Sequence, residues 1–329
     1  MDNKINVFLI TGFLGAGKTT ALNYLLKTVA GQRNVVIENE FGKASVDGTL
    51  ITKAYNEMYE LSNGCICCSL DEELYDVLSL LANSTERAQN LFIETTGVAD
   101  AGSVAAIFTR EDVGKVFDLK RVICVADAEN VEDYLEETNE TIRQLVCADL
   151  IVINKIDFVS SEYTLKLRAI LSKVNPFAEI IFSNDGSIPD GLLMSPVLEK
   201  NPVLPEQDGV LLGIGKHKIN TVTYRTENEF YKDYLLHTLN VSMMIHYSQI
   251  YRIKGFIKLE RSDEKILLQS TGKRLTLENY GTWEVPNPVS ELVFIGVGLQ
   301  TPGIQRILRP AIKTVNAKTR AEREANFNA

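Results

Sequence analysis

The sequence predicts an α/β protein with a doubly wound, mostly parallel sheet, followed by a smaller α+β domain. In the first half of the chain, short apolar runs alternate with stretches of helical periodicity, which is typical of buried parallel strands joined by helices. From about residue 187 to 216 prolines become frequent and this alternation stops. We therefore expect domains over 1–186 and 217–329, joined by a linker over 187–216.

Six apolar runs are expected to form strands of the first domain. They are "INVFLI" (5–10), "NVVI" (34–37), "LFIET" (91–95), "RVICVADA" (121–128), "LIVINK" (150–155) and "EIIFS" (179–183).

The second domain is expected to contain strands and two helices. The strands are "TVTYRT", "YRIKGFIKLE", "KILLQST", "RLTLENY" and "ELVFIGVGL", and the helices cover 229–247 and about 303–315. The charged tail "AKTRAEREANFNA" is expected to be frayed or exposed to solvent.

The composition excludes several classes of protein. The 34 basic and 43 acidic residues give a net charge of −9, which disfavours binding to nucleic acid or anionic lipid. No apolar run approaches the roughly 20 residues that a membrane helix needs, and no signal peptide follows Met1. We therefore expect a cytoplasmic protein. Its five cysteines have no disulfide-framework spacing, which favours free thiols or metal ligands.

The first run leads directly into "GFLGAGKTT", which matches the phosphate-binding pattern G-x-x-x-x-G-K-[ST] with Gly12, Gly17, Lys18 and Thr19. Backbone N–H groups of such a loop surround phosphate oxygens, the lysine reaches the β and γ phosphates, and the threonine hydroxyl binds Mg²⁺. Leucines with helical spacing follow, as a helix aimed at the phosphates requires. The motif thus predicts a P-loop NTPase domain.

The motif "NKID" at 154–157 indicates which nucleotide is bound. The Asp157 carboxylate can accept hydrogen bonds from N1–H and the amino group of guanine, which adenine cannot donate. Asn154 would contact the base edge and Lys155 would lie over the ring. We therefore predict GTP.

Two carboxylates are candidates for the Mg²⁺ and water side of the phosphates. "LFIETTGVAD" places Glu94 at a strand end and Gly97 three residues later, where the Gly97 N–H could sense the γ phosphate. Glu40 follows the second predicted strand. For both acids the alternative is a solvated loop carboxylate.

Cys65, Cys67 and Cys68 in "GCICCSLDEEL" form a candidate metal site. Ser69 and Glu72 have capping-box spacing, so a helix should begin directly after Cys68 and favour thiolates at its N-terminus. Only three ligands are local, which suits an ion that is loaded and released better than a structural ion with four ligands. Zn²⁺ is the first candidate, then Cu⁺ or Co²⁺.

The alternatives to a metal site at these three cysteines are a redox switch, buried apolar cysteines or a fortuitous cluster. Cys124 and Cys147 are expected to be core residues.

Together, "GFLGAGKTT", "ENEFG", "ELSNGCICCSL", "IETTGVAD" and "VINKID" resemble the CobW-type (cobalamin-synthesis W-like) GTPase metallochaperones, and the second domain resembles that family's small C-terminal domain. The resemblance implies a GTPase that binds a divalent metal and couples its delivery to hydrolysis. It implies phosphate contacts along Gly12, Gly15, Ala16, Gly17, Lys18, Thr19 and Thr20. It also implies metal ligation by the three thiols, Mg²⁺ and water contacts by Thr19, Glu40 and Glu94, and guanine recognition by Asn154 and Asp157.

The chain departs from many family members in one respect. A histidine-rich stretch near the domain boundary is reduced to "GKHK" with His217, which puts a metal reservoir in doubt. The expected partners are a guanine nucleotide, a divalent metal and an unidentified client metalloprotein. A dimer that depends on metal or GTP is left open. The functional alternatives are a nucleotide-dependent metal or redox sensor with negligible turnover and, less favoured, a small-molecule kinase.

Overall fold

The computed structural model describes residues 4–39, 55–61, 69–97, 99–189, 191–195, 219–246 and 249–327. The chain divides into two compact units, unit 1 over Met1–Pro202 and unit 2 over Val203–Ala329. Within the described ranges, none of the helices has the length and apolar character that crossing a bilayer requires.

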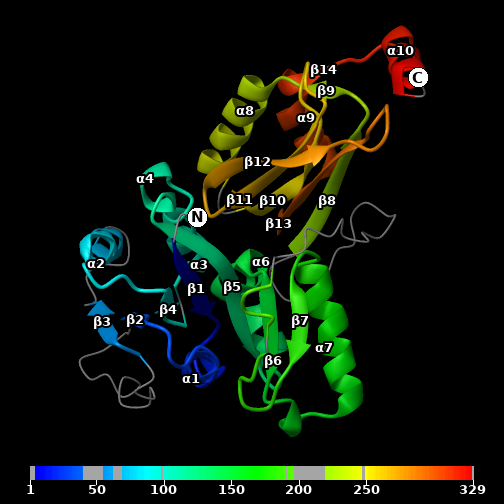
Figure 1. Cartoon of the computed structure of the whole chain (residues 1–329). Coiled ribbons are helices and arrows are strands. Elements are labelled where there is room, and N and C mark those ends of the chain that lie inside the picture. Colours follow the sequence, from blue (N-terminus) through cyan, green and yellow to red (C-terminus); the bar gives the residue numbers. More distant parts are fainter. Residues whose placement is uncertain are drawn as a thin grey trace. The chain divides into compact units, whose positions relative to one another are not determined.

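Unit 1 is built on a seven-stranded sheet in which all neighbouring strands run parallel, in the order β3-β2-β4-β1-β5-β6-β7 (Figure 1). The strands are β1 (Ile5–Thr11), β2 (Asn34–Asn39), β3 (Glu57–Leu61), β4 (Asn90–Glu94), β5 (Phe117–Asp127), β6 (Leu150–Asn154) and β7 (Glu179–Phe182). The doubly wound parallel fold and all six predicted strands are confirmed. β3 was missed, because "EMYEL" is a short edge strand without a continuous apolar run.

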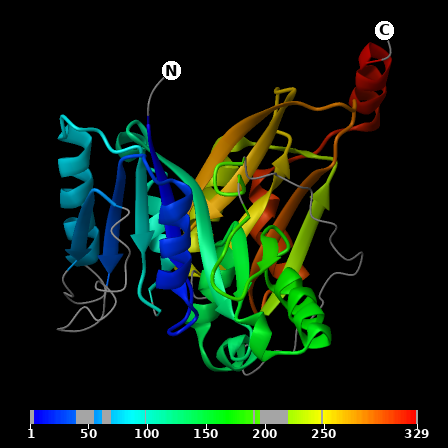
Figure 2. The ribbon, with the colours of Figure 1, turned by 60° about the horizontal axis from the view of Figure 1, so that its bottom comes forward.

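Helices cover both faces of this sheet. Helix α1 (Lys18–Thr28) packs on one face through Leu22, Leu25 and Leu26, and Figure 2 shows it lying along the strands. Helices α2 (Ser69–Asn83) and α3 (Ala101–Ile107) pack on the opposite face. The remaining helices of unit 1 are α4 (Glu111–Gly114), α5 (Val131–Glu137), α6 (Asn139–Cys147), η1 (Ile156–Phe158) and α7 (Ser161–Val174).

The predicted helix after the thiols is confirmed in position, because α2 begins at Ser69. The proposed contact between the side chains of Ser69 and Glu72 lies outside what the structure describes. Beyond residue 186, Ile188 and Leu193 are buried in the same core as α1, so the packed part of unit 1 reaches into the predicted linker.

Unit 2 contains a five-stranded antiparallel sheet in the order β12-β11-β10-β13-β8, as the α+β prediction requires. Its strands are β8 (Ile219–Thr226), β10 (Ile250–Ile257), β11 (Glu264–Thr271), β12 (Arg274–Thr282) and β13 (Ser290–Val297). Helices α8 (Lys232–Ile245) and α9 (Thr301–Leu308) pack against one of its faces around a shared apolar core.

Two expectations for unit 2 were wrong in detail. Glu229–Phe230 form β9, paired with β14 (Ile312–Lys313), so α8 starts only at Lys232. The last predicted helix ends at Leu308, because Pro310 falls in the short 3-10 helix η2 (Arg309–Ala311) that follows. The tail was expected to be frayed or exposed to solvent, and its described side chains are exposed or half-buried although its backbone is helical.

The tail forms helix α10 (Ala317–Phe327). Arg320 pairs with Glu227, and Arg323 pairs with the buried Glu229. These tertiary ion pairs, which local sequence does not reveal, hold the helix.

Candidate functional site

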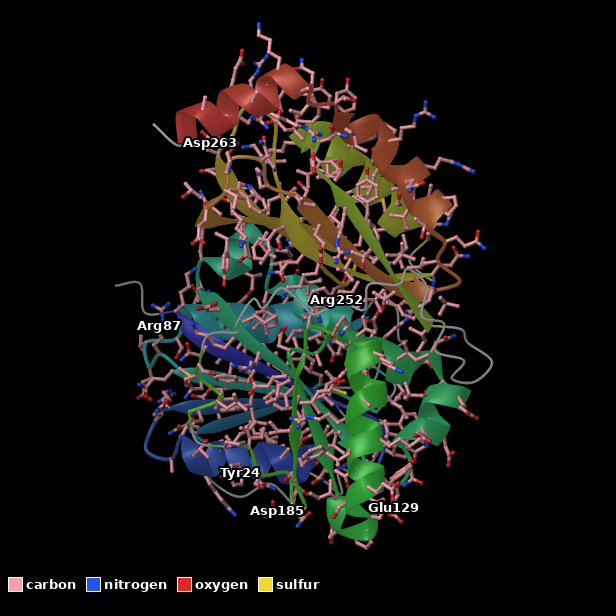
Figure 3. All side chains as sticks on the ribbon, turned by 90° about the vertical axis from the view of Figure 1, so that its right-hand side faces the viewer. Tyr24, Arg87, Glu129, Asp185, Arg252 and Asp263 are labelled. Atoms are coloured by element: carbon pink, nitrogen blue, oxygen red, sulfur yellow. The ribbon has the colours of Figure 1, made fainter. Side chains whose placement is uncertain are left out.

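The predicted nucleotide residues follow strands of the parallel sheet of unit 1. Because parallel strands end at the same edge, residues after β1, β4, β6 and β7 lie near one another, as is usual for ligand sites in such sheets. Figure 3 labels Glu129 and Asp185, which follow β5 and β7 and lie at the same end of unit 1.

The phosphate loop needs glycine at two positions. A Cβ atom on Gly12, which has φ 137°, would lie 2.1 Å from the Val125 carbonyl oxygen. A Cβ atom on Gly17, which has φ 100°, would lie 2.4 Å from Nδ2 of Asn154. Both close approaches and both positive φ angles exclude larger residues. Helix α1 starts immediately afterwards, so its positive end faces the loop.

The Lys18 side chain folds back over this loop. It is buried, and its ammonium donates a 3.3 Å hydrogen bond to the Phe13 carbonyl. The Phe13 ring in turn lies against the Tyr134 ring of α5, with the centroids 4.0 Å apart. A positive charge is thus positioned at the loop where an anion would bind.

Thr19 and Glu94 meet although they are far apart in the sequence. The Thr19 hydroxyl donates a 3.0 Å hydrogen bond to Oε1 of Glu94, which is buried at the end of β4. Hydroxyl and carboxylate oxygens are the ligands that Mg²⁺ prefers. These two residues are therefore suitable ligands for the Mg²⁺ ion that accompanies a nucleoside triphosphate.

Sequence reasoning missed a second buried carboxylate, Glu38. In the parallel register Glu38 of β2 lies opposite Glu94 of β4, at the usual spacing of about 4.8 Å between strands. Val36 and Phe92, two residues before each acid, both pack on the α1 side, so the acids share that side of the sheet. The available signal was a glutamate inside an apolar strand. The predicted acid, Glu40, lies outside the described residues.

The loop after β4 lies directly against the phosphate loop. A Cβ atom on Gly97 would lie 2.6 Å from the Leu14 backbone nitrogen. Thr95 starts this loop with backbone and side-chain hydrogen bonds to β1, at 2.9 Å to the Ile10 carbonyl and 3.0 Å to the Thr11 hydroxyl. Glu94 and Gly97 are therefore positioned together beside the phosphate loop.

Asn154 joins the "NKID" motif to two other loops. Its buried amide donates to the Ala16 carbonyl at 3.0 Å and accepts from the Gly186 N–H at 2.9 Å. The described contacts of Asn154 are thus with backbone, and its contact with a base stays a prediction.

The two charged residues of "NKID" have different surroundings. Lys155 has φ 62° and donates to the buried Asp127 carboxylate at 2.8 Å. Burial by itself would raise the pKa of Asp127, but hydrogen bonds from Lys155, the Glu129 N–H and the Asn130 amide together hold this pKa below its ordinary value. Asp157 is exposed in η1. Its carboxylate is therefore accessible to a base.

The predicted thiol ligands Cys65, Cys67 and Cys68 lie outside the described residues. Among the residues that the structure does describe, no group of three His, Cys, Asp or Glu side chains is arranged to hold a metal. Cys124 is a core residue as predicted, and burial raises the pKa of its thiol to about 12, with Lys18 offsetting part of this effect. It therefore stays protonated at neutral pH. Cys147 is only partly buried.

Comparison with known proteins gives consistent matches to both units. Residues 6–182 match the family model "CobW/HypB/UreG, nucleotide-binding domain", and residues 219–312 match "Cobalamin synthesis protein cobW C-terminal domain".

Curated relatives cover nearly the whole chain. The zinc chaperone YjiA of Escherichia coli is 30% identical, over 90% of this chain and 95% of its own length. The zinc-regulated GTPase metalloprotein activator 1 of Dictyostelium discoideum is 28% identical, over 85% and 68% respectively. The crystal structure of Zn(II)-bound YjiA GTPase from E. coli has a TM-score of 0.71 at 25% identity and covers 94% of this chain and 99% of that one. The chain therefore belongs to the CobW/HypB/UreG family of nucleotide-binding proteins and carries a CobW C-terminal domain.

Proposed function

We propose that this protein is a GTPase that hydrolyses GTP with Mg²⁺ and uses its nucleotide state to control a divalent metal, Zn²⁺ before Co²⁺, which it delivers to a client metalloprotein. Relatives named zinc chaperone and zinc-regulated GTPase support this class. The structural observation that carries the nucleotide part is the 3.0 Å hydrogen bond from Asn154 to the Ala16 carbonyl. This hydrogen bond joins the phosphate loop to the "NKID" motif, to which we assign guanine recognition.

Guanine recognition is assigned to Asp157, supported by its exposure beside Asn154. Two charge-assisted hydrogen bonds, each contributing about 1.5–3 kcal/mol, favour GTP over ATP by at least about a hundredfold. Competition binding with GTP and ATP tests this, using Asp157→Asn and, as control, Asp112→Asn, an exposed aspartate on α4. Equal affinity of the wild-type protein for GTP and ATP would contradict GTP as the substrate.

The hydrolytic side is assigned to residues around the phosphate loop. The Thr19 hydroxyl would hold Mg²⁺ and Glu94 would bind it directly or through water, as their 3.0 Å contact allows. Lys18 would move from the Phe13 carbonyl to the β and γ phosphates, and the Gly97 N–H would donate to the γ phosphate. Bound Mg²⁺ would neutralise charge on the phosphates. Gly12, Gly15, Ala16, Gly17 and Thr20 complete the proposed phosphate contacts.

Binding of the delivered metal is assigned to Cys65, Cys67 and Cys68. Glu40 is assigned to the Mg²⁺ and water side of the phosphates. The position of the three cysteines directly before Ser69, where α2 begins, supports their assignment, because a helix N-terminus favours thiolates. Metal affinity is measured by chelator competition in the GTP-analogue and GDP forms. We expect different affinities in the two forms and loss of binding in Cys67→Ala, but not in Cys147→Ala. Equal affinities with negligible turnover would instead indicate a metal or redox sensor.

We also propose a cytoplasmic location, because thiolate ligands need a reducing compartment. A dimer that forms with metal or GTP is also proposed. Light scattering of the purified protein with and without Zn²⁺ and a GTP analogue measures this, and a constant monomer mass would exclude it.

A further inference from the structure

Gln144 of α6 is a fully buried polar side chain, with 0% of its surface exposed. Its amide nitrogen donates to two backbone carbonyls of the loop after β4, at 3.0 Å to Gly97 and 3.3 Å to Ala99. Nη1 of the preceding residue, Arg143, lies 3.7 Å from Oδ2 of Asp100. Asp100 caps α3 by accepting a hydrogen bond from the Gly102 N–H. Two successive residues of α6 thus hold the end of this loop.

The amide oxygen of Gln144 has no hydrogen-bond partner among the described residues. The described side-chain hydrogen bonds of Gln144 are therefore both made by its amide nitrogen. Replacement by an apolar side chain would leave the two loop carbonyls without this donor. The arrangement therefore favours a role for the amide nitrogen in fixing the loop.

The loop that Gln144 holds is the one that contacts the phosphate loop. At the start of this loop, Thr95 donates a hydrogen bond to the Thr11 hydroxyl of β1, and Gly97 lies close to the backbone of Leu14. Among the described residues of its second half, Gly97 and Ala99 accept hydrogen bonds from the amide of Gln144 through their carbonyls. The Gly97 carbonyl belongs to the peptide after Gly97, so holding it limits rotation about the Gly97 Cα and thereby the direction of the Gly97 N–H in the preceding peptide.

From these contacts we infer that Gln144 is a positioning residue for the γ phosphate of GTP. By holding the Gly97 and Ala99 carbonyls it fixes the backbone around Gly97, and with it the direction of the Gly97 N–H, without touching nucleotide itself. This inference rests on the proposed GTPase function. GDP lacks the γ phosphate, so Gln144 should affect GTP binding and hydrolysis but not GDP binding.

The test compares the full-length wild-type protein with Gln144→Leu. We expect GDP affinity within twofold of wild type. The affinity for a non-hydrolysable GTP analogue and the single-turnover hydrolysis rate should each fall about tenfold. An unchanged ratio of analogue to GDP affinity would overturn the inference. A wild-type protein that neither binds nor hydrolyses GTP would overturn the proposed function itself, which is a different result.

Asn175→Leu is the matched control. Asn175 is also a fully buried amide that donates to backbone carbonyls near the end of α6, at 2.7 Å to Leu145 and 2.9 Å to Ala148. We expect a lower melting temperature and an unchanged ratio of analogue to GDP affinity. An equal fall of this ratio in Asn175→Leu would show that only the stability of α6 matters, and would overturn the inference.

Gln144→Glu provides a second test, because a loss of stability alone would not produce the pH dependence that we expect for this variant. The ionised carboxylate cannot donate to the two carbonyls, whereas the protonated carboxyl group can donate to one. Relative to wild type at each pH, the ratio of analogue to GDP affinity should rise as the pH is lowered from 8 to 6. A flat pH profile, with the ratio equal to that of wild type, would contradict the positioning role.

Discussion

The Thr19 hydroxyl lies 3.0 Å from Oε1 of Glu94, which joins the first turn of α1 to the end of β4. The two residues are 75 positions apart in the chain. Both are of the type that binds Mg²⁺, so this contact marks where the cation and the phosphates would meet.

Glu94→Gln tests this contact. The substitution keeps the shape and an acceptor for Thr19 but removes the negative charge, so we expect Mg²⁺-dependent GTP hydrolysis to fall about a hundredfold. GDP affinity measured without Mg²⁺ should change little. Glu264→Gln in unit 2, where the carboxylate lies 3.4 Å from the Ser262 hydroxyl, serves as the control. Hydrolysis at the wild-type rate in Glu94→Gln would exclude Glu94 from the reaction.

Asn154→Ala should affect both stability and binding. It leaves the buried Ala16 carbonyl and Gly186 N–H without their side-chain partner, which we expect to lower the free energy of unfolding by about 2–4 kcal/mol. GTP and GDP affinities should fall together, because the phosphate loop loses its support. Urea unfolding and nucleotide titration measure these effects, with the exposed Asn240→Ala on α8 as control. Unchanged stability would refute the linking role.

Gly97→Ala tests the close approach of the two loops. The added methyl group would lie 2.6 Å from the Leu14 nitrogen, so the phosphate loop must move and nucleotide affinity should fall at least about tenfold. Gly114→Ala is a suitable control, because its nearest neighbour would be the Phe108 carbonyl oxygen at an ordinary 3.5 Å. If titration with GTP gave the same affinity for both variants, the loops would not be in contact in solution.

Asp127 predicts a specific pH dependence. Its folded-state pKa lies below the ordinary value, as hydrogen bonds from Lys155 and its neighbours outweigh the effect of burial. This contribution to stability is therefore present above the unfolded-state pKa of about 3.9. It is lost as the pH falls through the lower folded-state value.

Urea unfolding of the wild type and Asp127→Asn between pH 3 and 7 measures this dependence. We expect the difference in unfolding free energy between the two proteins to shrink below about pH 4. The Asp112→Asn variant should follow the wild-type curve more closely at neutral pH, because Asp112 is exposed. A difference that grows on acidification would mean that the pKa of Asp127 is raised instead.

The sequence by itself determined the local elements of this protein. Apolar runs predicted six strands, and the glycines of the phosphate loop with the leucines of α1 predicted a strand-loop-helix unit, because each of these signals lies within a few consecutive residues. The edge strand β3 and helix α10 were not predicted. One lacks a continuous apolar run, and the other is held by ion pairs to distant glutamates.

Tertiary structure alone decided which side chains meet. Asn154 reaches the phosphate loop across 138 positions, Glu38 lies opposite Glu94 on neighbouring strands, and Gln144 holds a loop 47 positions away. Long crossovers between parallel strands bring these residues to one sheet edge, and the strand order is set by packing of the whole core. A motif therefore indicates which chemistry is present, while the sheet determines which atoms are close enough to take part.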